Sequence, residues 1–145
     1  MRKIFFIDNL NSIIDLYSDF LSLKGYKIAV ATSVEDFMKR HYTFNPDLII
    51  YDTDMPRKES SKFSDFISTF PSHLSTPVLF LTGFINESKL RNFKNIENSS
   101  FLSKNSSNVQ VLKRIIMLMD KDKDSSELQI AYGIHSIEQP TALNR

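Results

Sequence analysis

Four polar side chains stand where short apolar runs of the sequence end. They are Asp8 after IFFI, Asp52 after LIIY, Thr82 after VLFL, and Lys104 after FLS. A carboxylate can attack phosphorus and form an aspartyl phosphate. A lysine and a hydroxyl can neutralise and hydrogen-bond phosphoryl oxygens, and Mg²⁺ prefers oxygen ligands of the carboxylate type. The four residue types together therefore favour phosphoryl transfer onto a carboxylate.

Buried-strand patterns alternate with amphipathic helical patterns along the chain. We expect strands at 4–7, 28–31, 48–51, 78–81 and 101–102, and helices around 13–21, 33–38, 64–70, 90–93 and 111–119. Gly25 suits the left-handed position that ends a helix, and Ser33 with Asp36 resembles a capping box. Strict alternation of this kind predicts an α/β fold, a doubly wound parallel sheet of five strands with helices on both faces.

In such sheets, ligands bind beyond the carboxyl ends of the strands. The four polar side chains come directly after predicted strands, although they are far apart in sequence. We therefore expect them to meet at one rim of the sheet and to form a single site.

Composition excludes several other kinds of protein. The 145 residues carry a net charge of +1, which gives no electrostatic reason for a nucleic-acid or anionic-membrane surface. The absence of cysteine excludes disulfides, thiolate metal sites and thiol nucleophiles. No apolar run approaches the roughly 18 residues of a membrane span. We expect a cytoplasmic protein with one domain over residues 1–120, followed by a polar tail or linker over 121–145 that could lead to an output domain.

The residues just described resemble the receiver domain of response regulators in bacterial two-component signalling, over about residues 3–120. The resemblance rests on the order and spacing of Asp8, Asp52, Met55-Pro56, Thr82 and Lys104, with Phe101 three residues before the lysine. It implies a flavodoxin-like (βα)5 fold with strand order 2-1-3-4-5. It also implies a signalling switch rather than an enzyme.

The resemblance assigns a role to each residue around the acceptor. Asp52 would take the phosphoryl group, and Lys104 would pair with the phosphoryl oxygens. Mg²⁺ would be held by Asp8, Asn9, Asp52 and the main-chain carbonyl of Thr53.

Further roles fall on the switch and on the lifetime of the phosphoryl group. By the same resemblance, Thr82 would move towards the phosphoryl group and Phe101 would turn inward with it. Gly83 would leave room for the phosphodonor. Asp54 and Phe84, each two residues after a site residue, would tune the lifetime, with Phe84 restricting the attacking water.

Four departures from the family pattern stand out. Asn9 replaces the second of two adjacent acids, which predicts weaker Mg²⁺ binding, and Asn105 replaces the proline after the lysine. Ser60 stands where a glycine usually closes the loop after Met-Pro. Glu97 and Asn98 replace a Gly-Ala pair before the fifth strand.

The sequence is compatible with three functions. The first is a phosphorylated receiver whose partners are a sensor histidine kinase or phosphotransfer protein and a downstream effector or output domain, with pairing of two chains undecided. The second is a degenerate receiver, favoured by Asn9, Asn105 and Ser60, that binds proteins without phosphorylation. The remote third is a haloacid-dehalogenase-type phosphatase, suggested by Asp52-Thr53-Asp54. Pro56, and the position of this segment after the third strand, count against it.

Overall fold

Five parallel strands form one sheet in the computed structural model, which describes residues 1–70, 76–83, 87–93 and 96–119. The strands are β1 (Lys3–Ile7), β2 (Lys27–Ala31), β3 (Leu48–Asp52), β4 (Val78–Thr82) and β5 (Ser99–Ser103). Their order is β2-β1-β3-β4-β5, and every neighbouring pair is parallel. The doubly wound sheet and its predicted strand order are confirmed.

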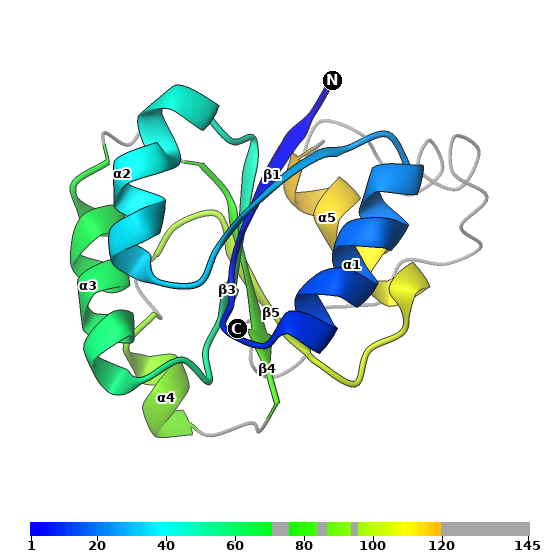
Figure 1. Cartoon of the computed structure of the whole chain (residues 1–145). Coiled ribbons are helices and arrows are strands. Elements are labelled where there is room, and N and C mark those ends of the chain that lie inside the picture. The colour runs from blue at the N-terminus through cyan, green and yellow to red at the C-terminus, as the bar shows by residue number, and fades with distance from the viewer. Residues whose placement is uncertain (71–75, 84–86, 94–95, 120–145) are drawn as a thin grey trace.

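Helices cover both faces of this sheet (Figure 1). They are α1 (Asn11–Leu23), α2 (Val34–Phe44), α3 (Arg57–Ser68), α4 (Glu87–Arg91) and α5 (Asn108–Met119). In Figure 1, α1 and α5 lie on one side of the strands, and α2, α3 and α4 lie on the other. Parallel strands joined by right-handed crossovers produce this three-layer arrangement.

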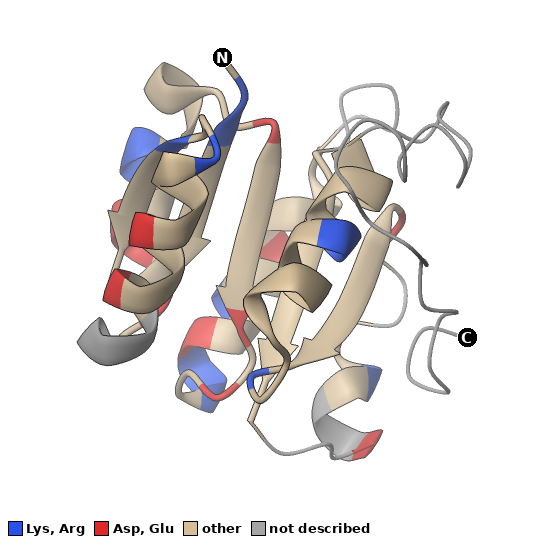
Figure 2. Cartoon of the chain, turned by 90° about the vertical axis from the view of Figure 1, so that its right-hand side faces the viewer, with Lys and Arg blue, Asp and Glu red and all other residues tan. Residues whose placement is uncertain are grey.

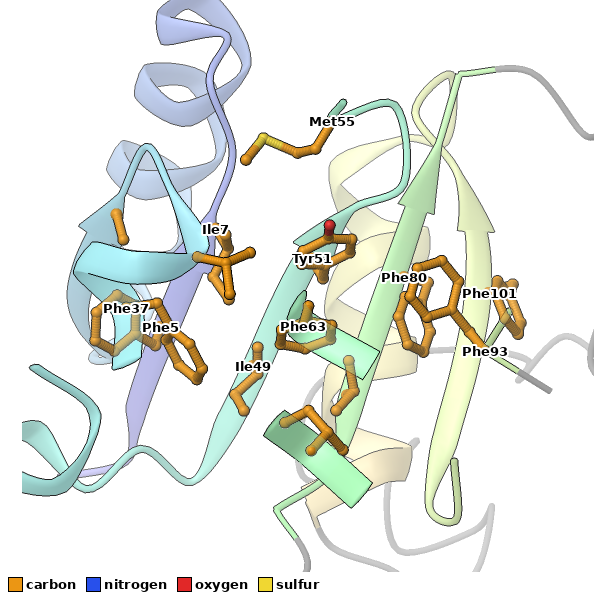
Figure 3. Packing of buried hydrophobic residues seen from close by; sticks show 14 of the residues in the cluster. Phe5, Ile7, Phe37, Ile49, Tyr51, Met55, Phe63, Phe80, Phe93 and Phe101 are labelled. Carbon is orange, nitrogen blue, oxygen red and sulfur yellow. The ribbon is translucent and has the colours of Figure 1, made fainter. Parts of the chain in front are cut away.

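Alternate strand residues supply two separate cores. Residues such as Ile50 and Leu79 pack towards α1 and α5, whereas Ile49 and Phe80 pack towards α2, α3 and α4. The second core is rich in aromatic rings (Figure 3). All residues of the central strands β3 and β4 are buried. Strands covered on both faces need hydrophobic side chains throughout, and here the run ends only at the last residues, Asp52 and Thr82.

Gly25 and Ser33 lie at helix ends as the sequence predicts. Gly25 adopts a left-handed conformation with φ of 95° just after α1. Ser33 is the N-cap of α2, where its Oγ atom accepts a hydrogen bond of 3.1 Å from the Asp36 N–H. Because Asp36 lies 2.8 Å from Arg40, its carboxylate also forms an ion pair along the helix.

Several element boundaries differ from the prediction; helix α2, for example, continues to Phe44 rather than ending near residue 38. Helix α3 begins at Arg57 rather than near residue 64, because its exposed first turn has no apolar periodicity to reveal it. Ser60 therefore lies within a helix and does not close a loop. Strand β5 begins at Ser99, because the polar Ser99-Ser100 pair hides the strand pattern that precedes Phe101.

The predicted tail over 121–145 lies outside the described residues, so the domain boundary at residue 120 stays a prediction. None of the helices in the described part of the chain is long and apolar enough to cross a membrane.

Candidate functional site

The four predicted polar residues lie at the carboxyl ends of four strands. Asp52 and Thr82 are the last residues of β3 and β4, while Asp8 and Lys104 directly follow β1 and β5. Because β1 and β3 are neighbours with Ile7 opposite Tyr51, Asp8 and Asp52 come next to each other along this edge. Figure 2 shows acidic and basic positions side by side near the arrowheads of the strands.

Lys104 connects two of the acids. Its Nζ atom lies 2.6 Å from Asp52 Oδ1 and 3.0 Å from Asp54 Oδ2. The Asp52 side chain is 1% exposed and that of Lys104 is 10% exposed, so solvent screens their contact little. Burial lowers the pKa of Lys104, but its hydrogen bonds to Asp52 and Asp54 outweigh burial and hold that pKa above its ordinary value. The lysine is therefore a fixed positive charge beside a buried carboxylate.

Main-chain and side-chain hydrogen bonds fix the position of this lysine. The Lys104 N–H donates to the Thr82 carbonyl at 2.9 Å and so continues the pairing of β4 with β5. The Tyr17 hydroxyl on α1 donates to the Lys104 carbonyl at 3.3 Å. The loop that carries the lysine is therefore held from the sheet and from α1.

Asp8 is buried, and its two oxygens differ in their partners. Its Oδ1 atom accepts a hydrogen bond of 2.8 Å from the Leu10 N–H, which fixes the turn before α1. Burial, together with the nearby negative charge of Asp52, raises the pKa of Asp8 to about 6. Without a bound cation, the charged form of Asp8 is therefore disfavoured.

One oxygen of each of these two acids has chemistry that fits a bound metal ion. Asp8 Oδ2 and Asp52 Oδ2 are both buried, and within the described structure neither has a hydrogen-bond partner. Buried carboxylate oxygens without partners are costly, and a bound cation would satisfy them. Nowhere among the described residues do three or more His, Cys, Asp or Glu side chains form a metal cluster. A donor set of two carboxylates suits Mg²⁺, which prefers oxygen ligands.

Asn9 and Thr53 are the other two predicted ligands of Mg²⁺. Asn9 is exposed directly after Asp8. The Thr53 side chain is buried and turned towards β4, where its Oγ1 and N–H both donate to the Leu81 carbonyl, at 3.2 and 3.0 Å. The side chain is therefore engaged elsewhere, and only the main-chain carbonyl of Thr53 is left for the predicted role.

Asp54 and Gly83 are in direct contact, which the sequence did not predict. Asp54 Oδ2 accepts a hydrogen bond of 2.8 Å from the Gly83 N–H. A Cβ atom at Gly83 would lie 2.7 Å from the same oxygen, so a larger residue here would make the Asp54 carboxylate shift. The sequence shows that residue 83 is small, but it does not show that the Asp54 carboxylate lies beside it. Phe84, the other predicted tuning residue, lies outside the described residues.

The two predicted switch residues lie on one face of the sheet. Thr82 is fully buried, and the two-residue period of β4 places it on the same side as Phe80. Phe101 is 5% exposed, and its ring stacks on that of Phe80 with centroids 4.8 Å apart (Figure 3). The Phe101 ring therefore lies inside the protein in this structure.

Arg114 on α5 contacts the strand that carries Phe101, and the sequence did not reveal this role. It is buried, and its guanidinium donates to Ser100 Oγ and, at 3.1 Å, to the Phe101 carbonyl. A signal was available, because Arg114 falls at helical spacing among the buried residues Val111, Ile115 and Leu118. An arginine on the apolar face of a helix indicates a buried hydrogen-bonding role.

The family to which this chain belongs follows from comparison with known proteins. Residues 4–116 match the response regulator receiver domain family, so the chain belongs to that family. Receiver domains are the signalling modules of two-component systems. No curated protein matches the chain.

Solved structures show the same fold at low sequence identity. The CheY-like receiver domain protein of Methanospirillum hungatei JF-1 is 16% identical, with a TM-score of 0.73 over 83% of this chain and 95% of that one. Vibrio cholerae chemotaxis protein CheY4 is 23% identical, with a TM-score of 0.71 over 81% and 98%. The BeF3-activated N-terminal receiver domain of Klebsiella pneumoniae RstA is 16% identical, with a TM-score of 0.69 over 81% and 98%.

Proposed function

We propose that this receiver domain is a phosphoryl-accepting switch of a two-component phosphorelay, with Asp52 as the acceptor. The observation that carries the proposal is the 2.6 Å contact between Lys104 Nζ and the buried Asp52 carboxylate. It places a fixed cation where negative charge would accumulate during phosphoryl transfer.

The expected step is an in-line displacement at phosphorus. One carboxylate oxygen of Asp52 attacks the phosphorus of a phosphohistidine on a sensor kinase or phosphotransfer protein. The new P–O bond forms as the P–N bond breaks, and the imidazole nitrogen keeps the electron pair and takes up a proton. Lys104 pairs with the phosphoryl oxygens as they approach.

The same residues would hold Mg²⁺. Asp8 and Asp52 supply carboxylate oxygens, joined by the Asn9 side chain and the Thr53 main-chain carbonyl. When bound, Mg²⁺ neutralises charge on phosphoryl oxygens and offsets the repulsion between the two carboxylates. The unpartnered Oδ2 atoms of Asp8 and Asp52 support this assignment.

Phosphorylation would bias the conformation of β5 and its flanking helices. It adds about −1.5 to −2 charge and several acceptor oxygens at the strand ends. Thr82 and Phe101 are the residues through which that change would reach a downstream effector or output domain. The stacking of Phe101 on Phe80 supports this path, because the two rings belong to neighbouring strands that end at the site.

Intact-mass measurement tests the proposal. The protein is incubated with Mg²⁺ and acetyl phosphate, with Asp52→Asn as the matched control. We expect one phosphoryl adduct on the wild type and none on the variant. If neither acetyl phosphate nor a panel of histidine kinases yields an adduct, the degenerate receiver that binds proteins without phosphorylation becomes the better assignment.

A further inference from the structure

Two hydrogen-bond donors from different strands converge on one oxygen of Asp54. Lys104, after β5, places Nζ 3.0 Å from Asp54 Oδ2. Gly83, after β4, donates its N–H to the same oxygen at 2.8 Å. A cationic donor and a main-chain N–H that meet at one point form a binding position for an anionic oxygen. In this structure the Asp54 carboxylate occupies that position.

This position lies beside the acceptor carboxylate. The same Lys104 Nζ atom lies 2.6 Å from Asp52 Oδ1, and the Asp54 N–H donates to Asp52 Oδ1 at 2.8 Å. A phosphoryl group on Asp52 would bring new anionic oxygens next to this lysine. Those oxygens and the Asp54 carboxylate would then compete for the same donors.

We propose that the Asp54 carboxylate is an internal competitor of the phosphoryl group, which holds Lys104 and the Gly83 N–H until phosphorylation displaces it. This inference rests on the proposed function, because it concerns the same acceptor site. It assigns Asp54 a defined role, the regulation of how readily the site accepts a phosphoryl group.

Electrostatics determines the direction of the effect. Two anions that share one lysine repel each other at short range, and a buried site screens that repulsion poorly. The Asp54 side chain is 27% exposed, against 1% for Asp52, so Asp54 is the group that can turn out into water. The displacement costs the hydrogen bonds that Asp54 accepts from Lys104 and Gly83, which lowers the affinity of the site for a phosphoryl group.

The absence of a side chain at Gly83 agrees with this contact. A Cβ atom at this position would lie 2.7 Å from Asp54 Oδ2 and 3.6 Å from Lys104 Cδ. With any other residue, this oxygen would have to shift from its present position. The residue pair Asp54 and Gly83 is therefore matched in shape as well as in hydrogen bonding.

Titration with beryllofluoride, a tetrahedral analogue of the phosphoryl group, tests the inference. The Gly83 amide resonance is followed by NMR at saturating Mg²⁺ in the wild type, Asp54→Asn and Asp54→Ala. Asp65→Asn is the control, because it removes the same charge from an exposed position on α3. The dissociation constant for Mg²⁺ is measured separately for each protein, so that saturation is assured.

We expect Asp54→Asn and Asp54→Ala to bind beryllofluoride about tenfold more tightly than the wild type, the size of one charge-assisted contact. Asp65→Asn should bind as the wild type does. Equal or weaker binding by both Asp54 variants would overturn the inference and leave Asp52 phosphorylation standing. An equal gain in Asp65→Asn would also overturn it, since the effect would then come from net charge. Absence of beryllofluoride binding in every protein, together with absence of a phosphoryl adduct, would overturn the proposed function and this inference with it.

Discussion

The Tyr51 hydroxyl lies 3.1 Å from Ser60 Oγ, in the buried layer between β3 and the first turn of α3. The Tyr51 ring stacks on Phe63 with centroids 4.2 Å apart (Figure 3). Burial raises the pKa of Tyr51 above its ordinary value, so the hydroxyl keeps its proton. This pair therefore joins the strand that carries Asp52 to the helix that follows the Asp52 loop.

Removal of either partner should lower the free energy of unfolding, and removal of both should cost less than the two single losses added together. Ser60→Ala leaves the buried Tyr51 hydroxyl without this partner, and we expect the free energy of unfolding to fall by about 1–2 kcal/mol. Tyr51→Phe should cost about 1 kcal/mol. The double variant should cost less than the sum of the two, because no polar group is then stranded. Urea denaturation of the four proteins measures this coupling, and strictly additive losses would contradict it.

Ser60 also shows where the sequence stops predicting the fold. The strands could be placed because apolar runs and turn residues are local signals, and their strict alternation determines a doubly wound sheet. The start of α3 could not, because Arg57, Lys58 and Ser61 face solvent and have no periodicity. Ser60 is the one buried residue of this turn, and its partner Tyr51 becomes visible only once β3 and α3 are packed together.

The sequence likewise predicts only part of the candidate site. Asp8, Asp52, Thr82 and Lys104 could be predicted, because parallel strands bring their carboxyl ends to one edge. The contact between Asp54 and Gly83 could not, because it depends on the conformations of two loops that do not follow each other in sequence. Spacing predicts which residues meet at the rim, but not which oxygen accepts from which donor.

His41 should make stability depend on pH. It lies buried on α2 against Phe37 and Phe70, with centroids 5.3 and 5.0 Å away, and neither ring nitrogen has a hydrogen-bond partner within the described structure. Burial lowers the pKa of His41 below its ordinary 6.5. Above pH 6.5 the ring is neutral in both folded and unfolded chains. As pH falls below that value, the unfolded chain binds a proton first, and the free energy of unfolding decreases.

A comparison of two proteins isolates this effect. The free energy of unfolding is measured from pH 7.5 to pH 5 for the wild type and for His41→Leu. We expect the difference between them to shift in favour of His41→Leu as pH falls. Parallel curves over this range would show that His41 titrates normally in the folded protein.

Asp8 should have the opposite pH dependence in protein without metal. The pKa of Asp8 is raised from 3.8 to about 6, chiefly by burial. A carboxyl group with a raised pKa contributes stability below pH 3.8, and this contribution is lost as pH rises through about 6. Asp8→Asn removes the loss, so the variant should be more stable than the wild type at pH 7.5, by about 3 kcal/mol if the whole shift acts on folding.

Thermal or urea unfolding in EDTA measures the gain, which should shrink as pH is lowered towards 4. Addition of Mg²⁺ should then stabilise the wild type more than Asp8→Asn, because the variant lacks one proposed ligand. A variant that is less stable than the wild type at pH 7.5 in EDTA would contradict the raised pKa.

Asn9→Asp should strengthen Mg²⁺ binding. Asn9 is exposed next to Asp8, so a carboxylate there would add one negative charge at the edge of the proposed metal site. Affinity for a hard cation rises with the number of charged oxygen ligands, and we expect a decrease in the dissociation constant of about tenfold. In EDTA, the same variant should be less stable than the wild type, because the added charge repels Asp8 and Asp52.

Isothermal titration with MgCl₂ measures the affinity, and Asn45→Asp serves as the control. Asn45 follows α2 and precedes β3, so it lies at the opposite edge of the sheet from the site, and aspartate tolerates its left-handed φ of 53°. The control adds the same net charge without adding a ligand. A similar gain in both variants would show that the added charge acts at long range, and an unchanged dissociation constant in Asn9→Asp would place residue 9 outside the metal site.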